Sequence, residues 1–448
     1  DLGLSSKLLQ SLLSALEQEG FLMHVNVENE SCWCERGLLA RIHRYGLSAL
    51  RKQVKPVSAS VFMQFLLHWN GLGSRRRSGE SALAAVLESL QGFACPAGAW
   101  ESDIIPARIR NFYGQDLDRL CSSGRFMWLR IPANVSRNET EDRVPTRSGI
   151  LKITPVVLLD RSCEIYWRSV KPSGEMNKPV LSSSATRIHD LLEKRGASFF
   201  MELVQGSELL RTQTEEALAE LAAAGLVTSD SFAGLRALIT PSNKRPGYRN
   251  RHRRRHYGSG IDAAGRWSII KEIKQPQQSN GWPTTDQQAL DHIAWTLLQR
   301  YGVVFYPLLV RENLLPPWRE LLYTYRRLEA RGEIRGGRFV DGFSGEQFAL
   351  PEAAGLLNKR WRDENEIISI SASDPLNLAG ILSPGERIPA HSGTHVIFRD
   401  GVPVARKNGN DLQFLKNLSA EDEWKIRNHI SEHLRGKSRP AHRSSLLQ

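Results

Sequence analysis

A pattern of apolar positions that ends at a glycine recurs four times along the chain. In each copy a Leu precedes a Gly by four residues and an apolar residue follows that Gly by two. The anchor pairs are Leu16/Gly20, Leu120/Gly124, Leu221/Gly225 and Leu328/Gly332. Apolar residues three and four apart form one stripe of a helix, and Gly ends a helix in a left-handed conformation without a Cβ clash. The alternating residues after each Gly predict a strand.

A helix that ends at Gly and runs directly into a strand is how a winged helix joins its third helix to its wing. That third helix can enter a DNA groove. The same junction occurs in many other α/β proteins, so a single copy would decide little. Four copies in one chain favour tandem winged helices, because internal repetition seldom arises by chance.

Further apolar patterns predict the elements between the repeats. Residues 35–53 form a basic amphipathic helix whose buried side we expect to carry Leu38, Leu39, Ile42, Leu47 and Leu50. Residues 150–159 and 162–170 predict strands that begin a β-rich module. Another winged helix is indicated by three helices at 184–194, 199–204 and 211–224.

These elements predict an α+β fold, mainly helical, with tandem winged-helix modules plus a β-barrel module. The chain of 448 residues is longer than one core serves, so several units are expected. It also starts in the middle of an element, which predicts a fragment of something longer. We expect the C-terminal half of a winged helix at 1–30, a helical or winged-helix module at 31–148, a β-barrel-like module at 149–182 with 234–275, winged helices at 183–233 and 284–364, and a C-terminal β segment with a helix at 365–448.

Composition narrows the class of protein. Hydrophobic residues make up 41% of the chain and charged residues 24%, as in ordinary soluble globular proteins. The sequence contains no run of apolar residues long enough to span a membrane and no signal-like opening, so a cytoplasmic protein without a membrane partner is expected. Sixty Lys and Arg against 48 Asp and Glu give a net charge of +12, which favours an anionic polymer such as nucleic acid as the partner.

Metal-ligating residue types are present without the spacing of a metal site. The five cysteines are scattered, and Cys32 and Cys34 are too close together for a zinc knuckle. His391 and His395 have a suitable spacing, yet two ligands do not make a site. We therefore predict no metal.

Basic residues are concentrated in residues 242–260, where arginines alternate with His and Tyr. Such a segment suits phosphate neutralisation with base stacking, and the alternative is a solvated insertion. Trp318 opens a predicted recognition helix and could stack on a flipped base, the alternative being a buried position. The predicted DNA-binding residues are Trp318 with Arg44, Arg76, Arg245, Arg249, Arg251, Arg253, Arg254, Arg255, Arg319, Arg326, Arg327, Arg335 and Arg338.

Four long segments carry a resemblance to the C-terminal part of the large helicase-related proteins of bacteria. They read LLARIHRYGLSALRKQVKPVSASVFMQFLLHW, LQGFACPAGAWESDIIPARI, PPWRELLYTYRRLEARGEIRGGRFVDGFSGEQFALPEA and SASDPLNLAGILSPGERIPA. In that family the N-terminal half is a DNA-dependent ATPase and translocase. This chain contains no G-x-x-x-x-G-K-[ST] loop, so the resemblance implies no cofactor here, with ATP and Mg bound by the motor half.

The resemblance also implies an architecture and partners. Tandem winged helices with a β-barrel are similar to the AlkZ family of DNA glycosylases, and some members of the helicase-related family have uracil-DNA glycosylase activity. The implied partners are single-stranded or forked DNA and the helicase motor of the same protein. A homo-oligomer is implied as well.

Removal of a base requires that the base leaves the stack and that a carboxylate lies near the sugar C1′ atom, with a donor to the leaving base. AlkZ-like enzymes use Gln-apolar-Gln or Gln-x-Asp after a Gly-aromatic step. Residues 98–103 read Gly-Ala-Trp-Glu-Ser-Asp, which offers Glu-x-Asp with Ser in place of the apolar residue. The alternative role for each carboxylate is a helix cap or a turn. The catalytic candidates are Asp103, Glu101 and Asp341, followed by Glu346 and Asp374.

The sequence thus predicts a DNA-repair region that removes uracil by hydrolysis without a metal. The alternative is a non-catalytic module for DNA binding and oligomerisation that positions the helicase. A multi-winged-helix transcription regulator is disfavoured, because neither a sensor domain nor a dimerisation helix is apparent.

Overall fold

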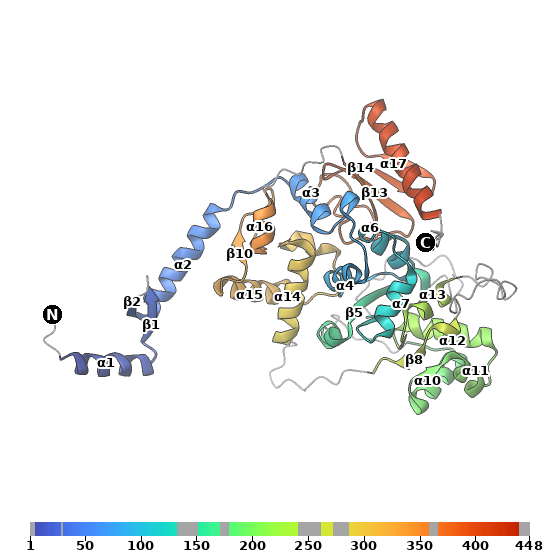
Figure 1. Ribbon diagram of the computed structural model, residues 1–448, viewed down its shortest axis with the longest axis horizontal. Coiled ribbons are helices and arrows are strands. Elements are labelled where there is room, and N and C mark those ends of the chain that lie inside the picture. Colours follow the sequence, from blue (N-terminus) through green and yellow to red (C-terminus); the bar gives the residue numbers. More distant parts are fainter. Residues whose placement is uncertain are drawn as a thin grey trace, which may run out of the picture.

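The computed structural model describes residues 5–27, 30–131, 151–170, 179–240, 261–271, 286–357 and 366–438. About half of the chain is helical. The strands of the described residues form five small sheets, one of two strands, three of three strands and one of four strands. Figure 1 shows an N-terminal arm that projects from a larger body.

The arm consists of a helix, a hairpin and a second helix. Its elements are α1 (Ser6–Gln18), β1 (Leu22–Val27), β2 (Glu30–Glu35) and α2 (Arg36–Gln53). The predicted helix at 35–53 is confirmed. Its predicted buried side is wrong for Leu38, Ile42 and Leu50, which are 44%, 54% and 60% exposed, whereas Leu39 and Leu47 are half-buried. The C-terminal end of α2, at Leu47 and Leu50, approaches β10 (Arg335–Gly337) of the third winged helix (Figure 1).

The first complete winged helix begins with α3. Strand β5 pairs antiparallel with both β3 and β4, which is the strand order of a winged helix. The elements are α3 (Ala59–Trp69), α4 (Glu80–Ser89), β3 (Cys95–Pro96), α5 (Ala97–Ala99), a π-helix (Trp100–Ile104), α6 (Ile105–Arg108), α7 (Gly114–Ser122), β4 (Phe126–Leu129) and β5 (Pro155–Asp160).

A second winged helix repeats this order, with β8 paired antiparallel to both β6 and β7. Its elements are α10 (Ser183–Arg195), β6 (Ser198–Phe199), α11 (Phe200–Ser207), α12 (Arg211–Ala224), β7 (Val227–Ser229), α13 (Phe232–Ile239) and β8 (Arg266–Ile269). The connection from β7 to β8 contains α13, which packs on α7 of the first winged helix. The Arg-rich segment at 242–260 falls in this connection along the sequence and lies outside the described residues.

A third winged helix and a separate sheet complete the body. In the winged helix, β11 pairs antiparallel with β9 and β10. Its elements are α14 (Gln287–Tyr301), β9 (Val303–Val304), a 3-10 helix (Tyr306–Arg311), α15 (Trp318–Ala330), β10 (Arg335–Gly337), β11 (Gln347–Ala349) and α16 (Pro351–Leu357). The sheet is an antiparallel meander of β12 (Ile367–Ser371), β13 (Thr394–Arg399), β14 (Val402–Asn408) and β15 (Asp411–Phe414), and α17 (Ala420–Ser438) packs on it.

The four Leu-to-Gly repeats are helix ends of one kind. Gly20, Gly124, Gly225 and Gly332 have φ angles of 75°, 83°, 75° and 74°. In three copies the N–H after the Gly donates to the carbonyl of the repeat's Leu, at 2.9 Å for Leu16, 3.0 Å for Leu221 and 3.1 Å for Leu328. This bond defines the Schellman motif, so the four-residue spacing from Leu to Gly is a hydrogen-bonding requirement. The predicted helix-Gly-strand junctions are confirmed.

The described residues do not form the predicted β-barrel. Residues 162–170, predicted as a strand, form the end of a 3-10 helix and α9 (Glu164–Arg168). The predicted second half contributes α13 and only one strand, β8, and β5 and β8 belong to different sheets. Helix α9 directs Trp167 into the core beside Gly92, where a Cβ would lie 2.0 Å from the indole ring. This tertiary contact outweighs the strand-like alternation of the segment.

Two large apolar cores hold the body together. The first two winged helices share one core, and the third packs with α3 and the C-terminal sheet around the other. Arg300 of α14 joins the two, because its buried guanidinium pairs with Glu312 and donates to the carbonyls of Ser89 and Gln91 at the end of α4.

We expect Gly225→Ala to destabilise the protein more than Gly332→Ala. Both residues have a left-handed backbone conformation, which costs Ala about 1–2 kcal/mol of folding free energy. A Cβ at Gly225 would also lie 2.9 Å from the backbone oxygen of Arg130, whereas Gly332 faces open space. Thermal unfolding of both variants measures the difference. Equal losses would contradict the tight approach at Gly225.

Candidate functional site

Asp103 lies in the π-helix of the first winged helix, and π-helical turns are frequent at functional sites. The turn is fixed by Trp100, which is fully buried and donates from Nε1 to the carbonyl of Val156 at 3.0 Å. Asp103 then faces β13 of the C-terminal sheet, where its Oδ1 lies 3.2 Å from Nε2 of His395. These side chains are 11% and 16% exposed, so the pair is sheltered but reaches the surface.

Ser102 completes the environment of the carboxylate. Its hydroxyl lies 2.7 Å from Oδ2 of Asp103 and 2.9 Å from the carbonyl oxygen of Gly98. Asp103 therefore has an imidazole at one oxygen and a hydroxyl at the other. Such a carboxylate is held in one orientation and can accept a proton or face a developing positive charge.

A buried ion pair positions the two sides of this site. Arg108 donates from Nη1 and Nη2 to Oδ2 and Oδ1 of Asp374 at 2.6 and 2.9 Å, and the two side chains are 1% and 0% exposed. Arg108 also donates to the carbonyl of Ile104, in the same turn as Asp103, at 3.2 Å. Because Asp374 is completely buried, we assign it a structural role and not a catalytic one.

Cys95 shows that the two aspartates converge. Its thiol is fully buried, and burial raises its pKa well above the usual value, with further increases from the charges of Asp374 and Asp103. The thiol therefore stays protonated and packs as a small apolar group. It marks the place where the first winged helix meets the C-terminal sheet.

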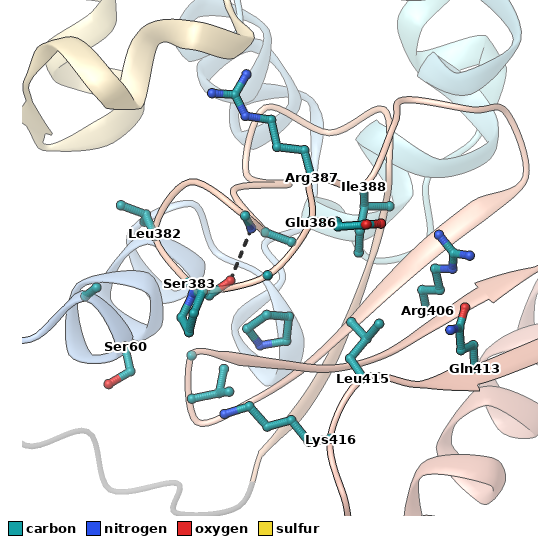
Figure 2. A pocket seen from close by; sticks show the side chains of 18 of the residues that line it. Ser60, Leu382, Ser383, Glu386, Arg387, Ile388, Arg406, Gln413, Leu415 and Lys416 are labelled. Carbon is teal, nitrogen blue, oxygen red and sulfur yellow. Dashed lines mark hydrogen bonds between the residues drawn. The ribbon is translucent and has the colours of Figure 1, made fainter.

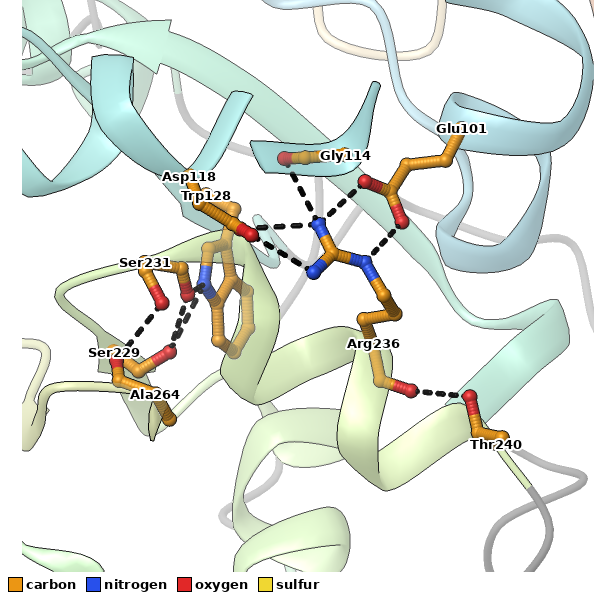
Figure 3. A network of polar contacts seen from close by, with 9 residues as sticks. All are labelled: Glu101, Gly114, Asp118, Trp128, Ser229, Ser231, Arg236, Thr240 and Ala264. Carbon is orange, nitrogen blue, oxygen red and sulfur yellow. Dashed lines mark hydrogen bonds and ion pairs between the residues drawn. The ribbon is translucent and has the colours of Figure 1, made fainter. Parts of the chain in front are cut away.

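Glu101 is held in a different network, which Figure 3 shows. Arg236 of α13 donates to Oε1 and Oε2 of Glu101 at 2.6 and 2.7 Å, and it also binds Asp118 at 2.8 and 3.0 Å. Burial raises the pKa of Glu101, because this outweighs the opposing effect of the Arg236 guanidinium. Two carboxylates share one guanidinium here, so Glu101 joins the first two winged helices instead of facing Asp103.

The other carboxylate candidates lie on the wing of the third winged helix. Asp341 is exposed, and its backbone N–H donates to the carbonyl of Val57 at 2.9 Å. Glu346 binds Arg51 at 3.0 Å and Arg326 at 2.8 Å. Burial acts to raise the pKa of Glu346, but these two guanidinium groups outweigh it and the pKa is lowered. The structure does not bring either residue to Asp103.

The predicted DNA-binding arginines fall into three groups. Arg326 and Arg327 pair with Glu346 and Asp291, so carboxylates partly neutralise them. Exposed arginines without an ion pair among the described residues are Arg44, Arg76, Arg319, Arg335 and Arg338. The residues outside the described part are Arg245, Arg249, Arg251, Arg253, Arg254 and Arg255.

Trp318 is packed and not free to stack on a base. Its ring centroid lies 5.9 Å from that of Tyr306 and 6.1 Å from that of Tyr325, and it packs against the core. Tyr323 is the exposed aromatic residue of α15, at 67% exposure, and sequence reasoning missed it. Its position four residues after Arg319, on the same helical face, is the signal that could have identified it.

Two further residues of the site were not predicted in their roles. His395 was considered only with His391, and 292 positions separate it from Asp103. No pattern in the sequence indicated the role of Arg236, because its partners lie in another winged helix. The described residues that could group around a metal ion are His189, Asp190 and Glu193 of α10, which have no contact with this site.

Comparison with known proteins adds the family. Two family profiles, each described as "Large helicase-related protein, winged-helix domain", match residues 57–145 and 283–367. The chain is 26% identical over 455 residues to "Lhr helicase/uracil glycosylase" of Escherichia coli, covering 93% of this chain and 27% of that protein. It is 27% identical over 404 residues to "Lhr helicase/ probable uracil glycosylase" of Mycolicibacterium smegmatis, covering 84% and 25%.

The chain belongs to the large helicase-related family. It corresponds to the C-terminal region of these proteins and spans about a quarter of the length of the two relatives. Within this large helicase-related region, Asp103 falls inside the first matched winged helix, whereas His395 lies beyond the second. The helices among the described residues are too short or too polar to cross a membrane.

We expect Asp374→Ala to destabilise the protein by about 3–5 kcal/mol, because it leaves the charge of Arg108 buried without a partner. The double variant Arg108→Met/Asp374→Leu should lose less, since it removes both charges. Urea unfolding followed by tryptophan fluorescence measures both. Asp341→Ala, at an exposed position, serves as the control and should stay within about 0.5 kcal/mol of the parent. Equal losses for the single and double variants would contradict this role.

Proposed function

We propose that this chain is a DNA-binding part of a bacterial DNA-repair helicase and that it removes uracil from DNA by hydrolysis of the N-glycosidic bond. The observation that carries the proposal is the sheltered carboxylate of Asp103, held between His395 and Ser102 at the surface. The names of the two relatives, which include uracil glycosylase, support the same reaction.

Asp103 would act on the sugar of an extruded nucleotide. As the bond to uracil breaks, positive charge develops at the sugar, and a carboxylate beside C1′ stabilises it. The same carboxylate orients the attacking water and takes its proton. His395 acts as a positioning residue, because a proton on its Nε2 would hold Oδ1 of Asp103 in place. Nothing in this sequence of steps requires a metal or a cofactor.

Binding of single-stranded or forked DNA is supported by the distribution of charge. The chain has a net charge of +12, and α15 exposes Arg319 and Tyr323 on one face. The Arg-rich segment falls, along the sequence, between β7 and β8 of the second winged helix. In winged helices, the third helix and the connection between the last two strands face DNA. A helicase motor in the same full-length protein and a cytoplasmic location are part of the proposal.

A second candidate function is a non-catalytic scaffold that binds DNA and self-associates. The arm favours it, because apolar residues are exposed on both of its helices, among them Leu8, Leu9, Leu12, Leu38 and Ile42. Exposed apolar patches of this kind mark association surfaces. This scaffold would position the motor and would not itself act on uracil.

Asp103→Asn should lower uracil excision by at least about 100-fold, because the neutral amide can neither stabilise the sugar cation nor accept the proton of water. The assay uses a uracil-containing single-stranded oligonucleotide in EDTA, followed by alkali to cut abasic sites. DNA affinity should stay unchanged. Asp341→Asn is the matched control and should excise uracil like the parent.

Three outcomes separate the candidates. Full activity of Asp103→Asn would disprove the assigned role of this residue. Tight DNA binding without excision by the parent would support the scaffold. Activity that depends on a metal would appear as a loss in EDTA and would correct the reaction proposed here.

A further inference from the structure

A pocket lies between α3 and the C-terminal sheet, and none of its lining residues belongs to the Asp103 site. Its volume is about 600 Å³, within the range of small-ligand pockets. The segment from Ala379 to Ile388 forms one wall, and the first turn of α3 forms another. Strands β14 and β15 complete it with Arg406, Gln413 and Lys416, as Figure 2 shows.

The polar side chains of this pocket include two available cations. Arg406 and Lys416 are exposed, and neither has an ion pair among the described residues. Arg406 lies directly opposite Gln413 in the register of β14 and β15, so both side chains stand on the same face of the sheet. Figure 2 shows Arg387 pointing away from them. Glu386 is the acidic residue in the lining, which leaves the pocket positive.

Arginines that tie the elements of the fold together have carboxylate partners. Arg51, Arg108, Arg236 and Arg300 are each paired with one or two carboxylates. Cations that the fold leaves without a partner around a concave surface are available to an external anion. The arrangement at Arg406 and Lys416 therefore differs from that of the structural arginines.

The pocket has a fixed frame. Ser58 caps α3 by accepting from the N–H of Val61 at 3.4 Å, and its Oγ lies 3.0 Å from that of Ser60. Gly401, in the turn between β13 and β14, packs so closely on this helix that a Cβ would lie 2.0 Å from the oxygen of Ser60. The turn is thus seated on the first turn of α3, whose positive end adds to the two cations.

The remaining lining is apolar. Leu382, Ile388, Pro403 and Leu415 form a surface on which a sugar and a base can pack. An apolar wall next to two cations suits a ligand that has both a flat, partly apolar ring and a phosphate. A nucleotide has both parts within one unit.

We propose that this pocket binds one nucleotide of single-stranded DNA, with Arg406 at the phosphate on one side of that nucleotide and Lys416 at the phosphate on the other. The inference rests on the DNA-binding part of the proposed function and is independent of uracil excision. The segment that follows β12 connects the pocket to the Asp103 site. Its Asp374 binds Arg108, and its residues from Ala379 onward line the pocket. Arg311 holds this segment at both ends, at 2.8 Å from the carbonyl of Ala372 and 3.3 Å from that of Ile388.

This connection gives the pocket a role in the proposed reaction. A nucleotide bound there holds the strand against the same segment that orients the Asp103 side of the molecule. The pocket then sets the position of the strand relative to Asp103. It is a strand-binding subsite and not the place where a bond is broken.

The test uses the full chain and the double variant Arg406→Ala/Lys416→Ala. Binding of a fluorescent single-stranded oligonucleotide is measured by anisotropy at several salt concentrations. Two lost phosphate contacts should weaken binding about tenfold and reduce the slope of log K against log salt by about 1.4. The control is Lys425→Ala/Arg427→Ala, which removes two cations from exposed pairs on α17 and should change neither quantity.

Thymidine monophosphate serves as a second probe, by calorimetry. The parent should bind it weakly and saturably, and the Arg406→Ala/Lys416→Ala variant should not, while both unfold at the same temperature. Equal oligonucleotide binding by the two double variants would overturn the proposal. Loss of thymidine monophosphate binding alone would also overturn it, since the pocket would then serve a free nucleotide. Neither readout depends on excision, so failure of the glycosylase proposal would be seen separately.

Discussion

The ion pair between Arg108 and Asp374 is the contact on which the candidate site depends. Two charges taken out of water lose several kcal/mol of hydration each, which only close bidentate geometry can offset. Both hydrogen bonds are present, at 2.6 and 2.9 Å. Because the pair is strict in its geometry, it fixes how the π-helix that carries Asp103 meets the sheet that carries His395. A purely apolar contact would hold the same surfaces together with less control of orientation.

Parts of the fold that depend on short stretches of chain could be predicted from the sequence. The Leu16-to-Gly20 spacing is one case, since a helix end of this type closes its hydrogen bonds within six residues. The copies at Gly225 and Gly332 follow for the same reason. Because every group that decides the conformation lies within two turns, the sequence contains the whole cause.

Other features could not be predicted, because their causes lie far away along the chain. Residues 162–170 alternate like a strand, yet they form a helix that places Trp167 beside Gly92, which is 75 positions earlier in the chain. The apolar stripe of α2 indicated burial, but the pattern does not say whether a partner is present. Asp103 was recognised through a motif, whereas its neighbour His395 comes from a strand 292 positions later. No local pattern encodes that encounter.

The net charge of +12 says little about where an anion binds, because most of the buried and half-buried arginines have internal partners. Arg236 serves Glu101 and Asp118, and Arg300 serves Glu312. Once these pairs are set aside, the positive charge that remains in the described residues is concentrated at particular places, among them Arg319 and the pair Arg406 and Lys416. A polyanion gains most binding free energy where cations lack an internal partner. The pairing of charges, more than their sum, therefore directs a strand across this molecule.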